Sequence, residues 1–421
     1  MHKDILAKKF FQLKLIEKFA VLLSLLVVFI YLGRVSGLQD SGTLMAAVQD
    51  MVNEKNPYLD PFFLNGFAIA FPYSFLKYVL GSLLFVRLYV LLNICLLVYV
   101  FFELSKKAFS LRNRLFLCLI LLISSPMRAM VDSVQHTGLL IACIYFSFKI
   151  FLNLEGADQF VSLKKNLLAS FLVFIVFELK PHFCLFIILI LVTKRKLRIV
   201  LLYFFVIFTV THIGISISLK MPLDLYWIER LMGRSGETTM ANSRENSLWT
   251  LFGTVLGYPV FWLVSSVLLF VVLIIFTLVR FRHKPFTMEY LIPVLIAPLS
   301  LAYVHTYDLL AVIFLLATSA QFAKSPKFSD GLWLLLLLPT LSRDLVLIGG
   351  SVLLFVLVSI VRHQRISSGS WFFYSLIITY YLLVDFYVSD VGLRVNILLS
   401  VITIYSFALF GKQFIQLSER F

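Results

Sequence analysis

Acidic residues and histidines are scarce in this chain, with 22 Asp and Glu and 7 His among 421 residues, and several stand where an apolar run ends. Asp40 follows the first such run, inside a turn bounded by Gly37 and Gly42. A carboxylate held there can accept a proton from an attacking hydroxyl within hydrogen-bond reach. Aspartate before a helical stretch is also a favoured helix cap, so capping is the alternative interpretation.

A second candidate is the polar interruption of the apolar run 167–192, which contains Lys180, Pro181 and His182. Lys180 could bind the phosphate of a lipid-phosphate substrate as a point charge. In the alternative interpretation Lys180 extends towards lipid head groups, and His182 is an ordinary interfacial residue. The proline break favours the functional interpretation, because it exposes backbone and charge at one tip.

His305 and Asp308 stand three residues apart, on one face of any helix that continues through them. Such a pair can orient a hydroxyl or a phosphate, or it can form a structural hydrogen bond between helices. As a metal site the pair is poor, because no third ligand is near it in the sequence. We therefore expect neither a metal nor another cofactor.

The segment 220–250 carries Arg230, Arg234, Arg244 and the polar stretch Asn242–Trp249. Arginines near an interface can bind phosphate, although a charged loop is more often simply solvated. The chain has neither a glycine-rich nucleotide loop nor a hydrolase nucleophile motif.

The composition decides which elements must position these residues. Hydrophobic residues make up 61% of the chain and charged residues 14%, with a mean hydropathy of +0.96. Soluble domains carry about 25% charged residues, so lipid must face most of this surface. We expect an all-α, polytopic integral membrane protein of about 11–13 transmembrane helices, several of them short and broken. The chain would form a single transmembrane domain over residues 1–421.

The net charge of +15 comes from basic clusters in short loops between apolar runs. Such clusters mark the cytoplasmic side of membrane proteins, so nucleic acid is not an expected partner. We expect the inner (plasma) membrane, with a cytoplasmic N-terminus, and the membrane of the endoplasmic reticulum is the alternative. The cysteines lie in apolar stretches and are predicted to be small apolar residues without disulfides. The clusters are Lys106–Arg114, Lys194–Arg198, Arg280–Lys284 and Arg362–Arg365.

An alternating topology satisfies these clusters if some apolar runs reverse direction. The run 167–192 has basic residues at both ends, so it should be two short helices broken at 178–182. The run 331–361 should break at Ser342–Asp344. The runs 115–130 and 134–152 should form a hairpin with Asp132, Gln135 and His136 at its turn. The ionisable tips and the outer loops 34–77 and 220–250 would then line one extracytoplasmic cavity.

These features, in this order, resemble the GT-C fold glycosyltransferases. More narrowly, residues 19–323 resemble the polyprenyl-phosphate-mannose-dependent α-mannosyltransferases of glycosyltransferase family 87. Beyond residue 323 the resemblance is limited to hydropathy, so 324–421 is expected to add C-terminal helices. The matching positions are Asp40 with Asn56-Pro57-Tyr58, Pro126 with Gln135, Lys180-Pro181 with the basic turn Lys194–Arg198, Asn242–Trp249, and His305-Thr306-Tyr307-Asp308-Leu309.

The resemblance implies an active site on the outer face, a polyprenyl-phosphate-linked sugar as donor and a glycan or lipid-linked acceptor. The sugar would be mannose or another hexose or pentose. Asp40 would be the general base, His305 would assist at the donor phosphate or acceptor hydroxyl, and Lys180 would contact phosphate. The other expected substrate contacts are Gln135, His136, Asp308, Tyr58, Asn246 and Arg244.

The chain departs from the family pattern at two places. Val134-Gln135-His136-Thr137 replaces Gly-Gln-x-Asn, and two residues separate His305 from Asp308. These changes bear on the sugar and the acceptor more than on the reaction class. Two other functions share the expected architecture. A flippase or transporter of lipid-linked sugars would need access from both faces, and an O-antigen polymerase or ligase would use paired outer-loop arginines.

Overall fold

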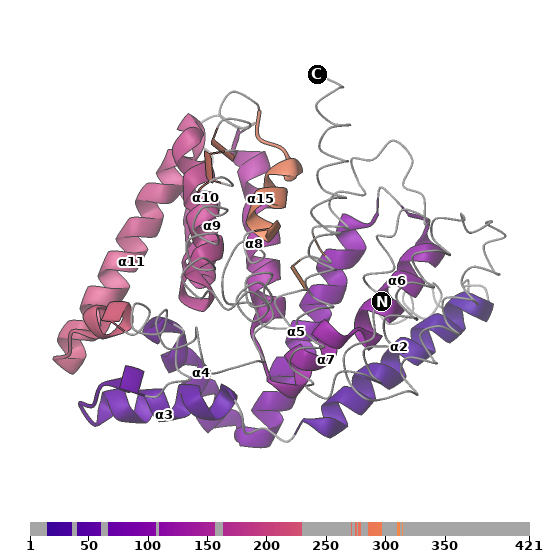
Figure 1. Cartoon of the computed structure of the whole chain (residues 1–421), viewed down its shortest axis with the longest axis horizontal. Helices are drawn as coiled ribbons and strands as arrows, with labels where there is room; N and C mark the ends of the chain where they lie inside the picture. Colours follow the sequence, from indigo (N-terminus) through magenta and orange to yellow (C-terminus); the bar gives the residue numbers. More distant parts are fainter. Residues whose placement is uncertain are drawn as a thin grey trace, which may run out of the picture.

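The computed structural model describes residues 15–35, 40–59, 66–106, 109–155, 163–229 and 285–296, and isolated residues at 271–278 and 310–314. All regular elements in these ranges are helices (Figure 1). They are α2 (Leu15–Arg34), α3 (Asp40–Val52), η1 (Pro57–Leu59), α4 (Phe67–Leu80), α5 (Ser82–Leu104), α6 (Leu111–Ile123), α7 (Ser125–Asp132), α8 (Thr137–Glu155), α9 (Leu163–Leu179), α10 (Pro181–Thr193), η3 (Arg195–Leu197), α11 (Arg198–Leu219), η4 (Met288–Tyr290) and α15 (Leu291–Ile296).

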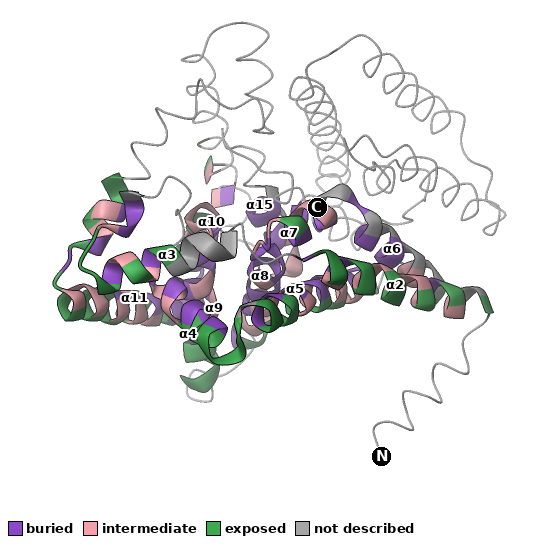
Figure 2. Ribbon diagram, turned by 90° about the horizontal axis from the view of Figure 1, so that it is seen from below, coloured by how far each residue is buried: buried purple, intermediate pink, exposed green. Residues whose placement is uncertain are grey.

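The helices form a row that runs from α11 at one side to α2 at the other (Figures 1 and 2). In the middle of this row, α8 packs against α5 and α9, and α9 packs against α10 and α11. The pair α3 and α4 lies across the lower ends of the helices on the α11 side of Figure 1, where α4 contacts α9 and α11. This end carries the polar network described below.

The predicted break in the run 167–192 is confirmed. Helix α9 ends at Leu179, Lys180 is extended, and α10 begins at Pro181, a position where its missing N–H costs no helical hydrogen bond. The Cys184 thiol donates to the Val173 carbonyl oxygen at 3.7 Å, so α10 folds back along α9. Both outer ends of this hairpin therefore lie at the same end of the molecule.

The predicted turn at Asp132, Gln135 and His136 is also confirmed, since α7 ends at Asp132 and α8 begins at Thr137. The single helix expected over 115–130 is wrong. Helix α6 stops at Ile123, and the Ser124 hydroxyl accepts the Met127 backbone N–H at 3.4 Å, which caps α7. A serine cap followed by a proline in the first turn starts a new helix, which the apolar pattern alone did not reveal.

The segment 34–77, expected as an outer loop, is mostly helical, because it contains α3, η1 and most of α4. Gly81, with a φ of 78°, separates α4 from α5, and this left-handed conformation favours glycine. The expected break at Ser342–Asp344 and the C-terminal segment 324–421 lie outside the described residues.

Three of the described helical segments are long and apolar enough to cross a membrane: Leu83–Leu104, Thr137–Glu155 and Arg195–Leu219. Two shorter apolar helices, α4 and α10, accompany them. All four cysteines are free thiols, three of them buried, as the sequence predicted.

The close contact of α5 with α8 gives a first prediction. A Cβ at Gly138 would collide with the Asn93 backbone, whereas a Cβ at Gly214 in α11 would meet nothing within 4 Å. We expect Gly138→Ala to lower the free energy of unfolding by about 1–3 kcal/mol through overpacking. Gly214→Ala, the matched control, should be neutral or stabilising by up to about 1 kcal/mol. Thermal unfolding in detergent measures both changes, and equal melting temperatures would contradict this packing.

Candidate functional site

Three ionisable side chains from distant parts of the chain form one hydrogen-bonded network. His212, in the middle of the apolar helix α11, contacts the Glu178 carboxylate through Nε2 at 2.6 Å. Its other ring nitrogen, Nδ1, lies 2.5 Å from a carboxylate oxygen of Asp224. Glu178 is the penultimate residue of α9, and Asp224 lies in the helical residues 223–229 that follow the turn after α11. The network therefore ties three helical segments together.

The protonation of His212 follows from this geometry. A neutral imidazole has one donor nitrogen, whereas each ionised carboxylate needs a donor. When both carboxylates are ionised, the ring must be an imidazolium that donates on both sides. Glu178 and His212 are each 1% exposed, and Asp224 is 38% exposed, so the inner pair is shielded from water and the outer carboxylate is not.

The N-terminus of α4 completes the coordination of Glu178. The second carboxylate oxygen of Glu178 accepts the Ala68 backbone N–H at 3.0 Å, and its backbone carbonyl accepts the Gly66 N–H at 2.8 Å. The first N–H groups of a helix lack partners within the helix and favour a negative charge. A Cβ at Gly66 would collide with the Glu178 carboxylate, so glycine is needed for this close approach.

Aromatic rings surround His212. Phe208 lies 4.0 Å and Phe67 4.5 Å from the imidazole, measured between ring centroids, and Phe174 and Trp227 follow at 6.1 and 6.4 Å. Rings at these distances exclude water, and their faces attract a cationic ring. The sides of His212 are thus closed, and the exposed part of the network is Asp224.

Tyr58, predicted as a substrate contact, belongs to the same network. Its side chain is buried, and burial raises the pKa of its hydroxyl well above the usual range, with further contributions from the negative charges of Glu178 and Asp224. The Phe67 backbone also forms a hydrogen bond with this hydroxyl. At neutral pH Tyr58 is therefore a neutral hydroxyl group beside two carboxylates.

His136, also predicted as a substrate contact, forms a second polar cluster. Its Nδ1 lies 2.5 Å from the Tyr89 hydroxyl, and its ring packs edge-on against Tyr73. Burial and, to a smaller extent, the positive charge of Lys180 together lower the pKa of His136 to about 4. Lys180 therefore lies near enough to His136 for its charge to affect the protonation of the imidazole. Gln135 lies beside His136 and is half-buried.

The remaining predicted residues are described in part or not at all. Asp40 is the first residue of α3, and its side chain lies outside the description. Tyr58 follows the far end of α3, whose 13 residues span about 20 Å. His305, Asp308, Asn246 and Arg244 lie outside the described residues, so their distances to this network are not defined.

The sequence interpretation missed His212 and Asp224, and it treated Glu178 as part of a helix break. A usable signal was present, because an ionisable residue inside an apolar span is costly and usually marks a function. After Arg198 at its first position, the 22-residue helix α11 has no other Asp, Glu, Lys, Arg or His than His212, which met that criterion. Its partners lie 34 and 12 residues away, and no local spacing pairs them. In the described part of the chain, no three His, Cys, Asp or Glu side chains are arranged to hold a metal ion.

The neutral state of His136 predicts a specific acid sensitivity. The unfolded chain binds a proton at this residue near pH 6.5, whereas the folded protein binds it only near pH 4. Stability from this residue is thus present above pH 6.5 and is lost as the pH falls towards 4, by on the order of 3 kcal/mol. Thermal unfolding between pH 7.5 and 4.5 should show a smaller loss for His136→Gln than for the unmodified protein. Parallel curves would contradict the buried neutral imidazole.

Comparison with protein families, with curated proteins and with solved structures finds no match for this chain.

Proposed function

We propose that the chain is a polytopic α-helical membrane protein of the inner (plasma) membrane, with about 11–13 spans. Its three long apolar helices support this proposal. So do large apolar side chains that face outwards, such as Phe29 on α2 at 75% exposure and Ile217 on α11 at 70%. A row of such side chains would be unfavourable in water, whereas lipid is a suitable solvent for it.

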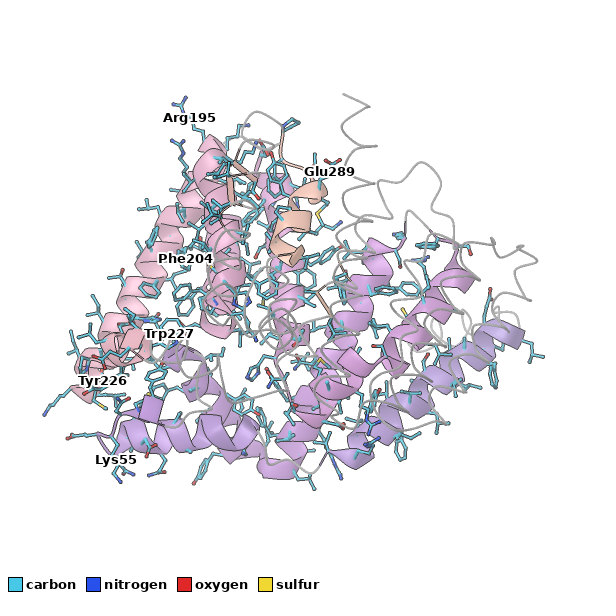
Figure 3. The ribbon with its side chains drawn as sticks, viewed as in Figure 1. Lys55, Arg195, Phe204, Tyr226, Trp227 and Glu289 are labelled. Atoms are coloured by element: carbon cyan, nitrogen blue, oxygen red, sulfur yellow. The ribbon has the colours of Figure 1, made fainter. Side chains whose placement is uncertain are left out.

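The position of the basic residues supports an orientation of the protein in the membrane. Figure 3 shows Arg195 at one end of α11 and Trp227, which packs near His212, at the other. Arg195 belongs to the basic turn Lys194–Arg198, and such turns favour the cytoplasmic side. The network of Glu178, His212 and Asp224 would then face the outside, and the N-terminus would be cytoplasmic.

We further propose that the protein is a glycosyltransferase that moves a sugar from a polyprenyl-phosphate donor to a lipid-linked or glycan acceptor. One observation carries the proposal. Polar groups of α4, α9 and α11 meet Tyr58 and Asp224 at the end of the molecule opposite the basic turn Lys194–Arg198. A lipid-phosphate leaving group needs nearby cations and hydrogen-bond donors. Lys180 beside His136 supplies such a cation at the tip of a helix hairpin.

The proposed roles follow the family resemblance. Asp40 would be the general base, His305 would assist at the phosphate or the acceptor hydroxyl, and Lys180 would contact the donor phosphate. Tyr58 and His136 would line the substrate cavity, from which burial and aromatic packing exclude water. The donor would enter sideways from the bilayer. The proposed reaction uses neither a nucleotide nor a metal.

Asp40 gives the direct test of this function. We expect Asp40→Asn to lower sugar transfer by about 100-fold or more, since a positioned general base contributes a factor of about 10²–10⁴. Asp50→Asn in the same helix, α3, is the matched control and should retain activity. Transfer from radiolabelled polyprenyl-phosphate sugars in liposomes measures both. Undiminished transfer in Asp40→Asn would remove this residue from catalysis.

The same assay distinguishes the other candidate functions. Movement of the labelled lipid between leaflets without a transferred product would identify a flippase instead of a transferase. Formation of a polymer from a diphosphate-linked oligosaccharide would identify a polymerase.

Lys180 gives a second test. We expect Lys180→Met to reduce kcat/KM for the donor by about tenfold or more, because a charge-assisted contact contributes about 1.5–3 kcal/mol. The control is Lys196→Met at the basic end of the molecule, where the Lys196 ammonium donates to the Glu155 carbonyl at 2.7 Å. This control should keep its kcat/KM. Equal losses in both variants would point to a general effect of lysine removal and would contradict a phosphate contact at Lys180.

A further inference from the structure

An open depression of about 430 Å³ lies beside Asp224, between the last turns of α11 and the helical residues 223–229. The sequence predicted only that the segment 220–250 would line a cavity, and it indicated none of the residues around the depression individually. Its polar lining is Ser216, Lys220 and Asp224, and its apolar lining includes Ile213, Ile217 and Leu225. These three apolar side chains are 51%, 70% and 60% exposed. The depression thus combines a polar floor with an apolar rim.

The charges of the floor limit what can bind. The Asp224 carboxylate and the Lys220 ammonium carry opposite charges, so the floor has no net charge that would draw in an anion or a cation over a neutral ligand. The carboxylate offers hydrogen-bond acceptors, the ammonium offers donors, and the Ser216 hydroxyl can do both. The Ser216 oxygen is buried and has no hydrogen-bond partner among the described residues. A buried hydroxyl without a partner is costly, so a hydrogen bond from a ligand to Ser216 would remove that cost.

Asp224 is also held in a fixed position, which a surface carboxylate ordinarily is not. One of its oxygens lies 2.5 Å from His212 Nδ1, and His212 is itself fixed by Glu178 at 2.6 Å. Side-chain ordering is a large part of the cost of binding, so a preordered carboxylate binds hydroxyl groups more tightly. Glu178 is in turn held by the Ala68 N–H at the α4 N-terminus. The contacts from α4 through Glu178 and His212 therefore fix the position of Asp224.

We infer that this depression binds the hydroxyl groups of a neutral, sugar-bearing amphiphile, with Asp224 as the main acceptor, Ser216 and Lys220 as partners, and the apolar rim against its chain. His212 and Glu178 are positioning residues for Asp224. This amphiphile would be the acceptor of the transferred sugar, and only that assignment rests on the proposed function. The binding itself requires no donor and no turnover.

The test is a binding titration of the full chain in phospholipid nanodiscs, free of glycoside detergent, with hexyl mannoside as the probe. We expect saturable binding that Asp224→Asn weakens at least about tenfold and that Ser216→Ala weakens by a smaller factor. Two matched controls should bind as the unmodified protein does. They are Glu229→Gln, an exposed carboxylate five residues further on, and Ser218→Ala, whose hydroxyl already donates to the Gly214 carbonyl at 2.7 Å.

Other probes decide the chemistry of the ligand. Hexanol should bind at least about tenfold more weakly than hexyl mannoside, because it offers a single hydroxyl. Equal binding of hexanol, or tighter binding of hexyl phosphate or hexylamine, would overturn the inference. Tighter, Asp224-dependent binding of glycerol monohexanoate would overturn the assignment to a sugar and identify a glycerolipid head group.

The positioning role of His212 is tested by rescue. His212→Leu should weaken binding as much as Asp224→Asn, and His212→Gln, which keeps a donor towards Asp224, should restore part of the affinity. If His212→Leu does not fold, the binding measurements with Asp224→Asn and Ser216→Ala still test whether the depression is the binding site. Binding that depends on Asp224 without any transfer activity would uphold the site and refute the transferase. Transfer activity without this binding would uphold the transferase and refute the binding site.

Discussion

The hydrogen bond between Glu178 and His212 joins the parts of the fold that the chain order keeps apart. Glu178 lies in the last turn of α9. Its carboxylate accepts the Ala68 backbone N–H in the first turn of α4 and contacts the His212 imidazole of α11. Burying a carboxylate in an apolar bundle costs several kcal/mol unless it is paired and hydrogen-bonded. Glu178 meets both conditions in one place, so the positions of α4, α9 and α11 depend on one another.

The hydrogen bonds of Glu178 also explain why α3 and α4 lie across the ends of α9 and α11. The N-terminus of α4 supplies N–H groups to Glu178, and glycine at position 66 allows the helix start to come close enough. Tyr58, which precedes α4, is drawn into the same polar region. The segment between the first and second long apolar runs is therefore built into the bundle and does not hang from it as a loop.

The proposed functions share this physical basis. A buried network that ends in a half-exposed carboxylate provides a rigid acceptor beside exposed apolar side chains, with aromatic rings excluding water behind it. The neutral His136 lies in the turn before α8, and the cationic Lys180 lies at the tip of the α9–α10 hairpin. Preorganised polar groups in a water-excluded region are what group transfer from a lipid phosphate requires.

The sequence by itself determined the helical class, the reversal of chain direction at Lys180 and the turn around His136. Long apolar runs, a proline and clusters of basic residues are local signals that can be detected along the chain. It also indicated Tyr58, Lys180 and His136 as polar groups of interest. It did not separate α6 from α7, where a serine cap outweighed a continuous apolar run. Tertiary structure alone decided that Glu178, His212 and Asp224 meet, because long-range packing sets that contact and no spacing along the chain encodes it.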